Sequence, residues 1–172
     1  MALLEIKKYP DKILKQKAAS IESIDRDIQC LINDMIETMY AARGVGLAAN
    51  QVGVLKRLCV IDTSIREEKS PLIVLVNPVI IENEGVEEAE EGCLSVPGYI
   101  PTIKRAAKVS VKGLSREGKP IEIEATGLFA RALQHEIDHL NGLLIIDRIS
   151  PIKREFFKKR FKKSLKAATS IK

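Results

Sequence analysis

Both histidines of the chain lie in one short stretch, Gln-His-Glu-Ile-Asp-His at residues 134–139. In an α-helix, residues four positions apart lie on the same face, so His135 and His139 can offer two imidazole nitrogens to one metal ion. Glu136 follows the first histidine and can reach a water molecule at such a site. Two histidines placed at random in a chain of 172 residues fall four apart in roughly 1% of cases, so chance explains the pattern poorly. The stretch therefore predicts a metal-binding helix that needs at least one further ligand.

Length and composition favour one domain. At 172 residues and 45% apolar, the chain can build one substantial core but not two. An apolar run such as residues 71–76 is far shorter than the ~18 residues of a membrane span, and the N-terminus has no export signal. The three cysteines are an odd number and suit a reducing compartment better than a disulfide framework. We therefore expect a cytoplasmic protein without a membrane segment, or an organellar one that has lost a transit peptide.

Basic residues are concentrated at the C-terminus. Residues 151–172 carry nine Lys and Arg side chains and one acid, Glu155, so this tail has a charge of +8 within a total of +5. Residues 1–150 therefore carry a net charge of −3. We expect a polyanionic partner, if there is one, to bind to this tail.

Periodicity predicts strands in the middle of the chain between helices. Apolar residues recur with helical spacing from Asp25, a good N-cap residue, to about Ala42, in a helix expected to pack against a sheet. Buried or half-buried strands are predicted at residues 58–62, 72–76, about 107–114 and about 120–125. A hairpin loop at residues 115–118 joins the last two. The segment 82–91 is charged, with Gly85 as a turn.

Two helices are predicted near the C-terminus. Thr126 can cap a helix from Gly127 to about Asn141, and Gly142 stands where a left-handed C-terminal cap is favoured. After Pro151 comes a basic helix with an apolar seam of Ile152, Phe156, Phe157, Phe161 and Leu165. We therefore expect a single α+β domain. In it, antiparallel or mixed sheets pack around a central helix that bears both histidines, with an N-terminal helix and a basic C-terminal helix.

The third metal ligand could be an acid or a thiolate. In one class of zinc protease the third ligand is a downstream glutamate, yet the only acids after His139 are Asp147 and Glu155. Another class uses a third histidine, and this sequence has only two. Cys93 is the better candidate, because glycines on either side permit an unusual backbone and a thiolate is a strong ligand for zinc or ferrous iron. Cys30 and Cys59 are interpreted as inert buried thiols.

Three segments together resemble the sequence motifs of the peptide deformylases, in the order that this family has them. They are Gly44–Gln51 (GVGLAANQ), Glu91–Ser95 (EGCLS) and Gln134–His139 (QHEIDH). The helix before the first motif, the strand at residues 57–62 and the hairpin around Gly118 also match the family plan. The resemblance therefore covers roughly residues 5–150, and three ordered motifs are far more specific than one HExxH pattern.

The resemblance implies an enzyme that removes the formyl group from the N-terminal formylmethionine of newly made polypeptides and releases formate. Cys93, His135 and His139 would hold one divalent metal, which is ferrous iron in most members and zinc in some, with nickel or cobalt as substitutes. Glu136 would take a proton from the attacking water and deliver it to the departing amine.

Further roles come with the resemblance. The side-chain amide of Gln51 and the backbone N–H of Leu94 would bind the oxyanion of the reaction intermediate. Gly46 would give backbone hydrogen bonds to an extended peptide, and Val45 and Leu128 would line the pocket for the methionine side chain. Residues 1–150 would form the catalytic domain, and residues 151–172 its basic C-terminal helix.

Several alternatives stay open at the level of sequence. The same histidine spacing serves metalloendopeptidases, and a non-catalytic module with a structural metal and a basic nucleic-acid tail is a second alternative. Asp138 either pairs with Arg105 as an orienting group near His135 or is a solvated helix acid. The tail is either a solvated helix docked by its phenylalanines or a contact for ribosomal RNA. No DNA partner is expected.

Overall fold

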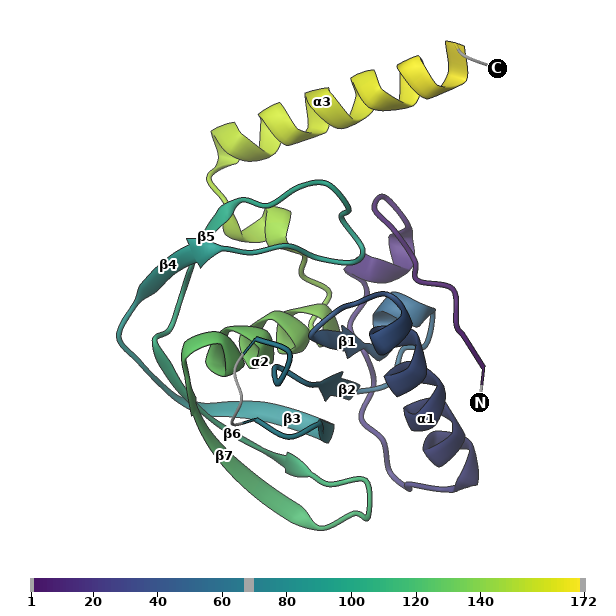
Figure 1. Ribbon diagram of the computed structural model, residues 1–172, viewed down its shortest axis with the longest axis vertical. Coiled ribbons are helices and arrows are strands. Elements are labelled where there is room, and N and C mark those ends of the chain that lie inside the picture. Colours follow the sequence, from purple (N-terminus) through teal and green to yellow (C-terminus); the bar gives the residue numbers. More distant parts are fainter. Residues whose placement is uncertain (1, 67–69, 171–172) are drawn as a thin grey trace.

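A five-stranded antiparallel sheet curves around helix α2, and a two-stranded sheet lies on the other side of that helix (Figure 1). The computed structural model describes residues 2–66 and 70–170. Its helices are α1 (Arg26–Ala41), α2 (Gly127–Leu140) and α3 (Pro151–Ser170), with short 3-10 helices η1 (Lys12–Lys15), η2 (Ala49–Val52) and η3 (Ile145–Arg148). Its strands are β1 (Gly46–Ala48), β2 (Leu58–Ile61), β3 (Ile73–Glu84), β4 (Glu87–Glu90), β5 (Thr102–Arg105), β6 (Lys108–Leu114) and β7 (Pro120–Thr126). The order β1-β2-β3-β6-β7 in one sheet and β4-β5 in the other confirms the predicted α+β class.

Helix α1 forms where the apolar periodicity predicts it. The Asp25 carboxylate accepts a hydrogen bond of 3.0 Å from the Ile28 backbone N–H, as an N-cap residue does. The buried face of α1 packs against the first two strands through Ile28, Ile32, Met35 and Met39. The predicted packing of this helix on a sheet is confirmed.

Strand β2 is buried on both faces, which explains its unbroken apolar sequence. Leu58 and Val60 belong to the core beneath α1, whereas Cys59 and Ile61 belong to the core beneath α2. The predicted burial of Cys59 is confirmed, and burial raises the pKa of its thiol. The same prediction for Cys30 is wrong: it lies on the exposed side of α1, away from the stripe that packs on the sheet.

Strand β3 is longer than the sequence predicts. The expected end at Val76 is wrong, because the strand continues through Asn77 and Pro78 to Glu84. Asn77 has a φ of +53° and the register shifts there, so a bulge accommodates the proline inside the strand. The charged segment 82–91 therefore supplies the end of β3 and all of β4, around the predicted turn at Gly85.

Helix α2 is the most buried helix of the fold, with every residue from 130 to 140 buried. It begins after Thr126 as predicted, but the Thr126 side chain makes no capping hydrogen bond, so its predicted capping role is wrong. That residue still pairs with Lys108 as the last residue of β7. At the other end, Gly142 has the predicted left-handed conformation, with φ of +78°. A Cβ there would lie 2.5 Å from the carbonyl oxygen of Lys15, so both conformation and space require glycine.

Helix α3 projects from the body and is held at its first half by aromatic side chains (Figure 1). Phe157 packs on Tyr9 and Tyr99, and Phe161 packs edge-on against Tyr9 with 4.8 Å between ring centroids. The prediction of one continuous apolar seam is wrong in part, because Ile152, Phe156 and Leu165 are more than half exposed. Among the described residues, Tyr9 and Tyr99 of the body contact the side of the helix that carries Phe157 and Phe161.

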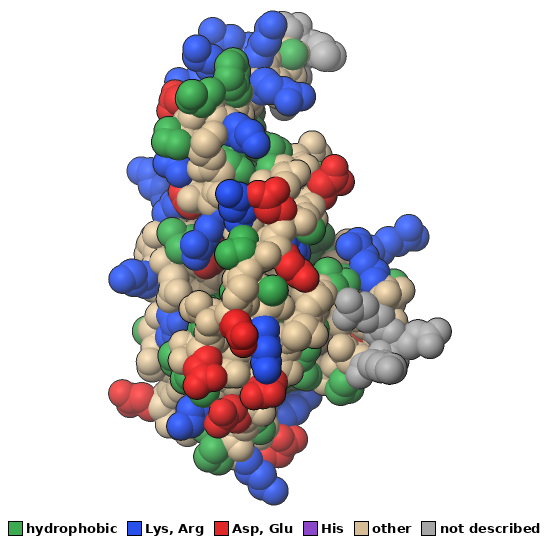
Figure 2. Space-filling view, turned by 90° about the vertical axis from the view of Figure 1, so that its left-hand side faces the viewer, with side chains coloured by type: hydrophobic (Ala, Val, Ile, Leu, Met, Phe, Trp, Pro, Cys, Tyr) green, Lys and Arg blue, Asp and Glu red, His purple; other side chains and the backbone are tan. Residues whose placement is uncertain are grey.

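The described basic side chains of α3 are exposed except for Arg154, which is half-buried against η3. Figure 2 shows Lys and Arg side chains gathered at the end of the molecule that α3 forms, with acidic side chains visible mainly over the body. Residues 171 and 172 of the predicted tail lie outside the described residues. Within the described part of the chain, no helix is both long enough and apolar enough to cross a membrane.

Candidate metal centre and active site

Helix α2 supplies two imidazoles to one point. His135 and His139 are one helical turn apart, and their Nε2 atoms lie 3.1 Å from each other. His135 is 9% exposed and His139 is 1% exposed. Burial, followed by the neighbouring His135, lowers the pKa of His139 well below its ordinary value, so this imidazole is neutral, as a metal ligand must be.

Cys93 reaches the same point from the loop between β4 and β5. Its Sγ lies 3.3 Å from the Nε2 of His139, and the three candidate ligand atoms lie within 4.8 Å of one another. In a tetrahedral site with metal–nitrogen and metal–sulfur bonds of about 2.0 and 2.3 Å, ligand atoms are roughly 3.3–3.6 Å apart. The two closest spacings fall within a few tenths of an ångström of that geometry. The three residues therefore fit a single divalent metal ion such as zinc or ferrous iron.

Glu91 fixes the orientation of His135. One carboxylate oxygen lies 2.7 Å from the Nδ1 of His135, so Nδ1 carries a proton towards Glu91 and Nε2 is the ring nitrogen that faces Cys93 and His139. The same carboxylate accepts two hydrogen bonds from Arg105 and one from Arg131. Burial alone would raise the pKa of Glu91, but the hydrogen bonds from His135 and Arg105 hold it far below its usual range. Glu91 is therefore an anion that stabilises a proton on the Nδ1 of His135.

A second buried acid continues this network towards the surface. Asp138 accepts hydrogen bonds from Arg105 at 2.5 Å and from Arg148 at 2.6 and 2.9 Å. Of the two alternatives left open for Asp138, pairing with Arg105 is the one that the structure contains. Arg105 joins Asp138 to Glu91, so η3 is connected to the orienting partner of His135 through two carboxylates.

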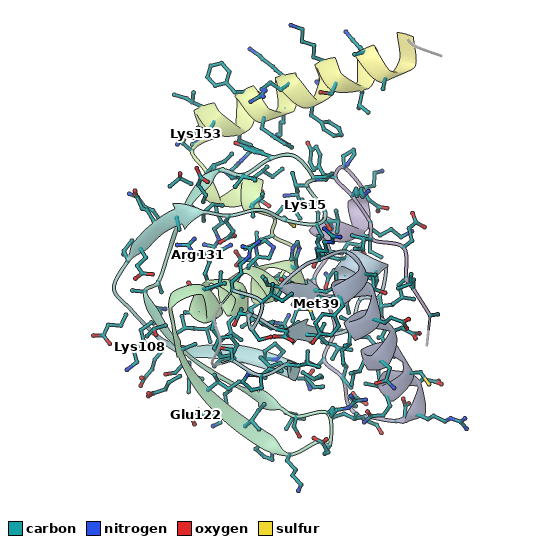
Figure 3. The ribbon with its side chains drawn as sticks, in the orientation of Figure 1. Lys15, Met39, Lys108, Glu122, Arg131 and Lys153 are labelled. Atoms are coloured by element: carbon teal, nitrogen blue, oxygen red, sulfur yellow. The ribbon has the colours of Figure 1, made fainter. Side chains whose placement is uncertain are left out.

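Arg131 ties α2 to the two-stranded sheet. Besides its hydrogen bond to Glu91, its guanidinium donates to the carbonyl oxygens of Ile103 and Glu87 at 3.0 and 3.1 Å. The labelled side chain lies between α2 and the β4–β5 sheet (Figure 3). This contact holds the loop with Cys93 in position relative to the helix with the histidines.

Glu136 is a buried carboxylate with one oxygen that has no hydrogen-bond partner among the described residues. Burial raises the pKa of Glu136 to about 7; His135 opposes that effect and Glu91 adds to it. Gly46 leaves the space that the carboxylate occupies, because a Cβ on Gly46 would lie 2.4 Å from Oε1 of Glu136. A buried, unpaired carboxylate with a pKa near neutrality can both accept and return a proton.

The carboxamide of Gln51 is held on both sides. Its oxygen accepts from the Ala48 backbone N–H at 3.0 Å, and its nitrogen donates to the Ser95 hydroxyl at 3.0 Å. The same nitrogen is 3.9 Å from the Sγ of Cys93. An amide nitrogen has two hydrogens, so the one in this long contact with Cys93 can be donated instead to a group bound beside the sulfur.

These residues surround one cavity of about 290 Å³. Eight of the nine predicted site residues line it: Val45, Gly46, Gln51, Cys93, Leu94, Leu128, His135 and Glu136. His139, the ninth, lies next to His135 just behind the wall. The structure therefore brings together residues that come from β1, η2, α2 and the loop after β4.

Three residues of the site, Glu91, Ser95 and Arg131, have no role predicted from the sequence. Glu91 and Ser95 are the first and last residues of the motif that holds Cys93, so their place in that motif was an available signal. Arg131 lies four residues before His135 and shares its helical face. That spacing could have been used in the same way as the spacing of the two histidines.

Three protein ligands with room for a fourth are typical of catalytic metal sites, whereas structural sites are usually closed by four. Among the residues that the structure describes, the ligand group consists of Cys93, His135 and His139. The fold and the site together define an α+β protein whose three candidate ligands fit the catalytic type of mononuclear metal centre.

The chain belongs to the polypeptide deformylase family, a family of enzymes whose model matches residues 3–155. A peptide deformylase of Thermodesulfovibrio yellowstonii is 65% identical over 162 residues, which cover 94% of this chain and 98% of that protein. One of Syntrophobacter fumaroxidans is 56% identical over 170 residues, which cover 99% and 100% of the two chains.

Solved structures agree with the sequence relatives. The crystal structure of a peptide deformylase from Legionella pneumophila is 50% identical with a TM-score of 0.88, and the match covers 97% of this chain and 98% of that one. The structure from Synechococcus elongatus, in complex with actinonin, is 42% identical with a TM-score of 0.82 and covers 86% and 81%.

Proposed function

We propose that this protein removes the formyl group from the N-terminal formylmethionine of nascent polypeptides and releases formate in the cytoplasm. The observation that carries the proposal is the group of half-buried Cys93 and buried His135 and His139 beside the Glu136 carboxylate, one oxygen of which has no partner, around a cavity of about 290 Å³. The names of the relatives support the same substrate.

Cys93, His135 and His139 would hold the metal. A divalent ion bound there would lower the pKa of a water molecule from about 15.7 towards 7 and would polarise a carbonyl group. Thiolate and imidazole ligands suit ferrous iron and zinc, with nickel or cobalt as substitutes, and we propose ferrous iron as the metal in the cell. Glu91 would keep the His135 ring in its ligating tautomer throughout.

Glu136 would move the proton. Its carboxylate accepts the proton of the attacking water and returns it to the amine that leaves as the formyl C–N bond breaks. A pKa near 7 lets one group do both at neutral pH. The Gln51 carboxamide hydrogen that faces Cys93 and the backbone N–H of Leu94 would donate to the oxygen that gains negative charge.

The peptide would lie along the rim of the cavity. Gly46 is the first residue of β1, and we propose that its backbone pairs with the extended substrate. Val45 and Leu128 supply apolar surface to the cavity and would contact the methionine side chain.

Formate release from formyl-Met-Ala-Ser by anaerobically purified protein tests the proposal, with metal content measured on the same sample. Glu136→Gln should abolish turnover and keep the metal. Gln51→Ala should lower turnover by the roughly 2.7–4 kcal/mol that one oxyanion donor contributes, again with the metal bound. Near-normal turnover of Gln51→Ala would remove Gln51 from the mechanism.

The same preparation distinguishes the competing functions. Cleavage of casein without formate release would identify an endopeptidase. Metal binding with no hydrolysis by the wild type or by Glu136→Gln would identify a non-catalytic module.

We propose ribosomal RNA as a partner of α3, because this exposed helix concentrates the positive charge of the protein. Replacing Lys162, Lys163 and Lys166 by glutamine should weaken ribosome binding and reduce its dependence on salt. All three side chains are exposed, so the variant should fold as the wild type does. Unchanged affinity and salt dependence would contradict the proposed contact.

A further inference from the structure

A second cavity, of about 410 Å³, lies between the loop at residues 97–100 and the first half of α3. Its wall on the body side is Pro97, Gly98, Tyr99 and Ile100, and its wall on the helix side is Lys153, Phe156, Phe157, Arg160, Phe161 and Ser164. We call it the α3 groove. Three of its residues, Gly98, Tyr99 and Ile100, also line the cavity that contains Cys93. The active-site cavity and the α3 groove therefore share one wall.

Aromatic packing fixes the helix side of the α3 groove. The ring of Tyr99 stacks on Phe157, with centroids 4.7 Å apart and an interplanar angle of 20°. The ring of Tyr9 meets Phe157 edge-on at 5.3 Å. Arg154 holds the start of the helix through a hydrogen bond of 2.9 Å to the Ile146 carbonyl oxygen. The groove is therefore set by contacts between α3 and the body.

At Gly98 the wall that the two cavities share leaves open space. Gly98 has a φ of +78°, and a Cβ built on it would meet nothing within 4 Å. Ile100, two residues further on, is 62% exposed. A chain that leaves the active-site cavity over this loop therefore meets little obstruction before the α3 groove.

The chemistry of the lining defines what the groove would bind. Lys153 and Arg160 contribute two positive charges, and the lining contains no Asp or Glu. Phe156 and Ile100 are both 62% exposed and provide apolar surface at the groove. Figure 3 places Lys153 at the end of α3 next to the body. Such a lining is complementary to an extended peptide with acidic and apolar side chains.

We propose that the α3 groove is an extension of the substrate site, which binds residues of the formylated peptide downstream of its methionine and favours acidic side chains there. The inference rests on the proposed deformylation, because it assumes that the formylated end occupies the cavity with Cys93. An extended peptide advances by about 3.3 Å per residue, so a few residues carry the chain from one cavity into the next. A tripeptide then ends before the part of the groove that carries the charges.

Peptides of increasing length test the proposal. Formyl-Met-Ala-Ser is extended residue by residue, with one Asp or one Lys at each successive position, and kcat and KM are measured for every peptide. The wild type should prefer Asp over Lys at the positions that reach the groove by about fivefold to tenfold in KM, since attraction and repulsion each contribute the small amount typical of an exposed ion pair. The preference should shrink at high salt.

Charge reversal on α3 identifies the residues that contribute to binding. Lys153→Glu combined with Arg160→Glu should invert the preference, so that the Lys peptides have the lower KM. Lys162→Glu combined with Lys166→Glu makes the same change in net charge at exposed positions outside the groove lining and should keep the wild-type preference. The dissociation constants of the same peptides on the Glu136→Gln protein give a second readout that does not depend on turnover.

The outcomes separate the two proposals. If formyl-Met-Ala-Ser releases formate but the longer peptides show no charge preference, or one that both double variants change equally, the extended site is refuted and deformylation stands. If no peptide releases formate, the proposed function fails, and the dissociation constants still decide whether the groove binds acidic peptides. A double variant at Lys153 and Arg160 that loses only ribosome affinity would make the groove an RNA surface and overturn the proposal.

Discussion

Replacing Glu91 by glutamine removes the single charge that His135, Arg105 and Arg131 share. The carboxylate receives four hydrogen bonds, two on each oxygen. An amide has only one acceptor oxygen, so its NH2 group must face two donors whichever way it is turned. The least costly orientation keeps the oxygen towards His135, because Arg105 retains Asp138 and Arg131 retains two carbonyl oxygens.

Two effects of Glu91→Gln can be measured separately. Breaking a buried charged network typically costs about 3–5 kcal/mol, and we expect the lower end because both arginines keep other acceptors. Loss of a carboxylate behind a ligating histidine typically weakens metal affinity by about 10–100-fold. Denaturant unfolding of the metal-free protein measures the first effect, and competition for zinc with a chelator measures the second.

The matched control is Glu88→Gln. Glu88 is 56% exposed and forms a 3.4 Å ion pair with Lys104, so its loss should change the free energy of unfolding by less than about 0.5 kcal/mol. A folded Glu91→Gln protein with wild-type metal affinity would refute the reasoning, because His135 would then be oriented without its anionic partner.

Three further predictions follow from single contacts. Ser95→Ala should lower kcat about fivefold with the metal retained, since the Gln51 carboxamide loses a neutral hydrogen bond worth about 1 kcal/mol. Gly46→Ala should lower kcat by more than that, because its new Cβ would lie 2.4 Å from Oε1 of Glu136 and displace the carboxylate. Burial, followed by a hydrogen bond to a carboxylate, raises the pKa of Tyr40 to about 12 in the folded protein, against about 10 in the unfolded chain. The stability it contributes is therefore complete below pH ~10 and is lost as the pH rises towards 12, so Tyr40→Phe should flatten the dependence of the unfolding free energy on pH in that window.

Controls accompany each of these. Ser95→Thr keeps the hydroxyl and should restore kcat if the hydrogen bond is what matters. Gly92→Ala adds a Cβ that would meet nothing closer than 3.9 Å and should leave metal binding intact. An unfolding free energy of Tyr40→Phe that falls between pH ~10 and 12 as steeply as that of the wild type would contradict the role of that phenol.

The elements that could be predicted from the sequence are those whose signal repeats within a few residues. Helix α1 has four turns of apolar periodicity and a capping aspartate, and β6 and β7 are joined by a short loop with glycine. Strands β1 and β5 have three and four residues, too few for periodicity to be seen. The continuation of β3 past Pro78 depends on a bulge at Asn77, whose side chain is held by two hydrogen bonds of 2.8 Å to the distant Ile21.

The sequence by itself determined that His135 and His139 share a helical face, because a spacing of four residues is a local property of the α-helix. It also marked Cys93 as the best third ligand. Only the tertiary structure decided that Cys93 meets His139, 46 positions away, and that Glu91 faces Nδ1 of His135. Those contacts depend on how the β4–β5 sheet lies against α2. That placement comes from side-chain packing and buried ion pairs between segments that are distant in the sequence. Such contacts produce no periodic pattern of residues that could be recognised in the sequence.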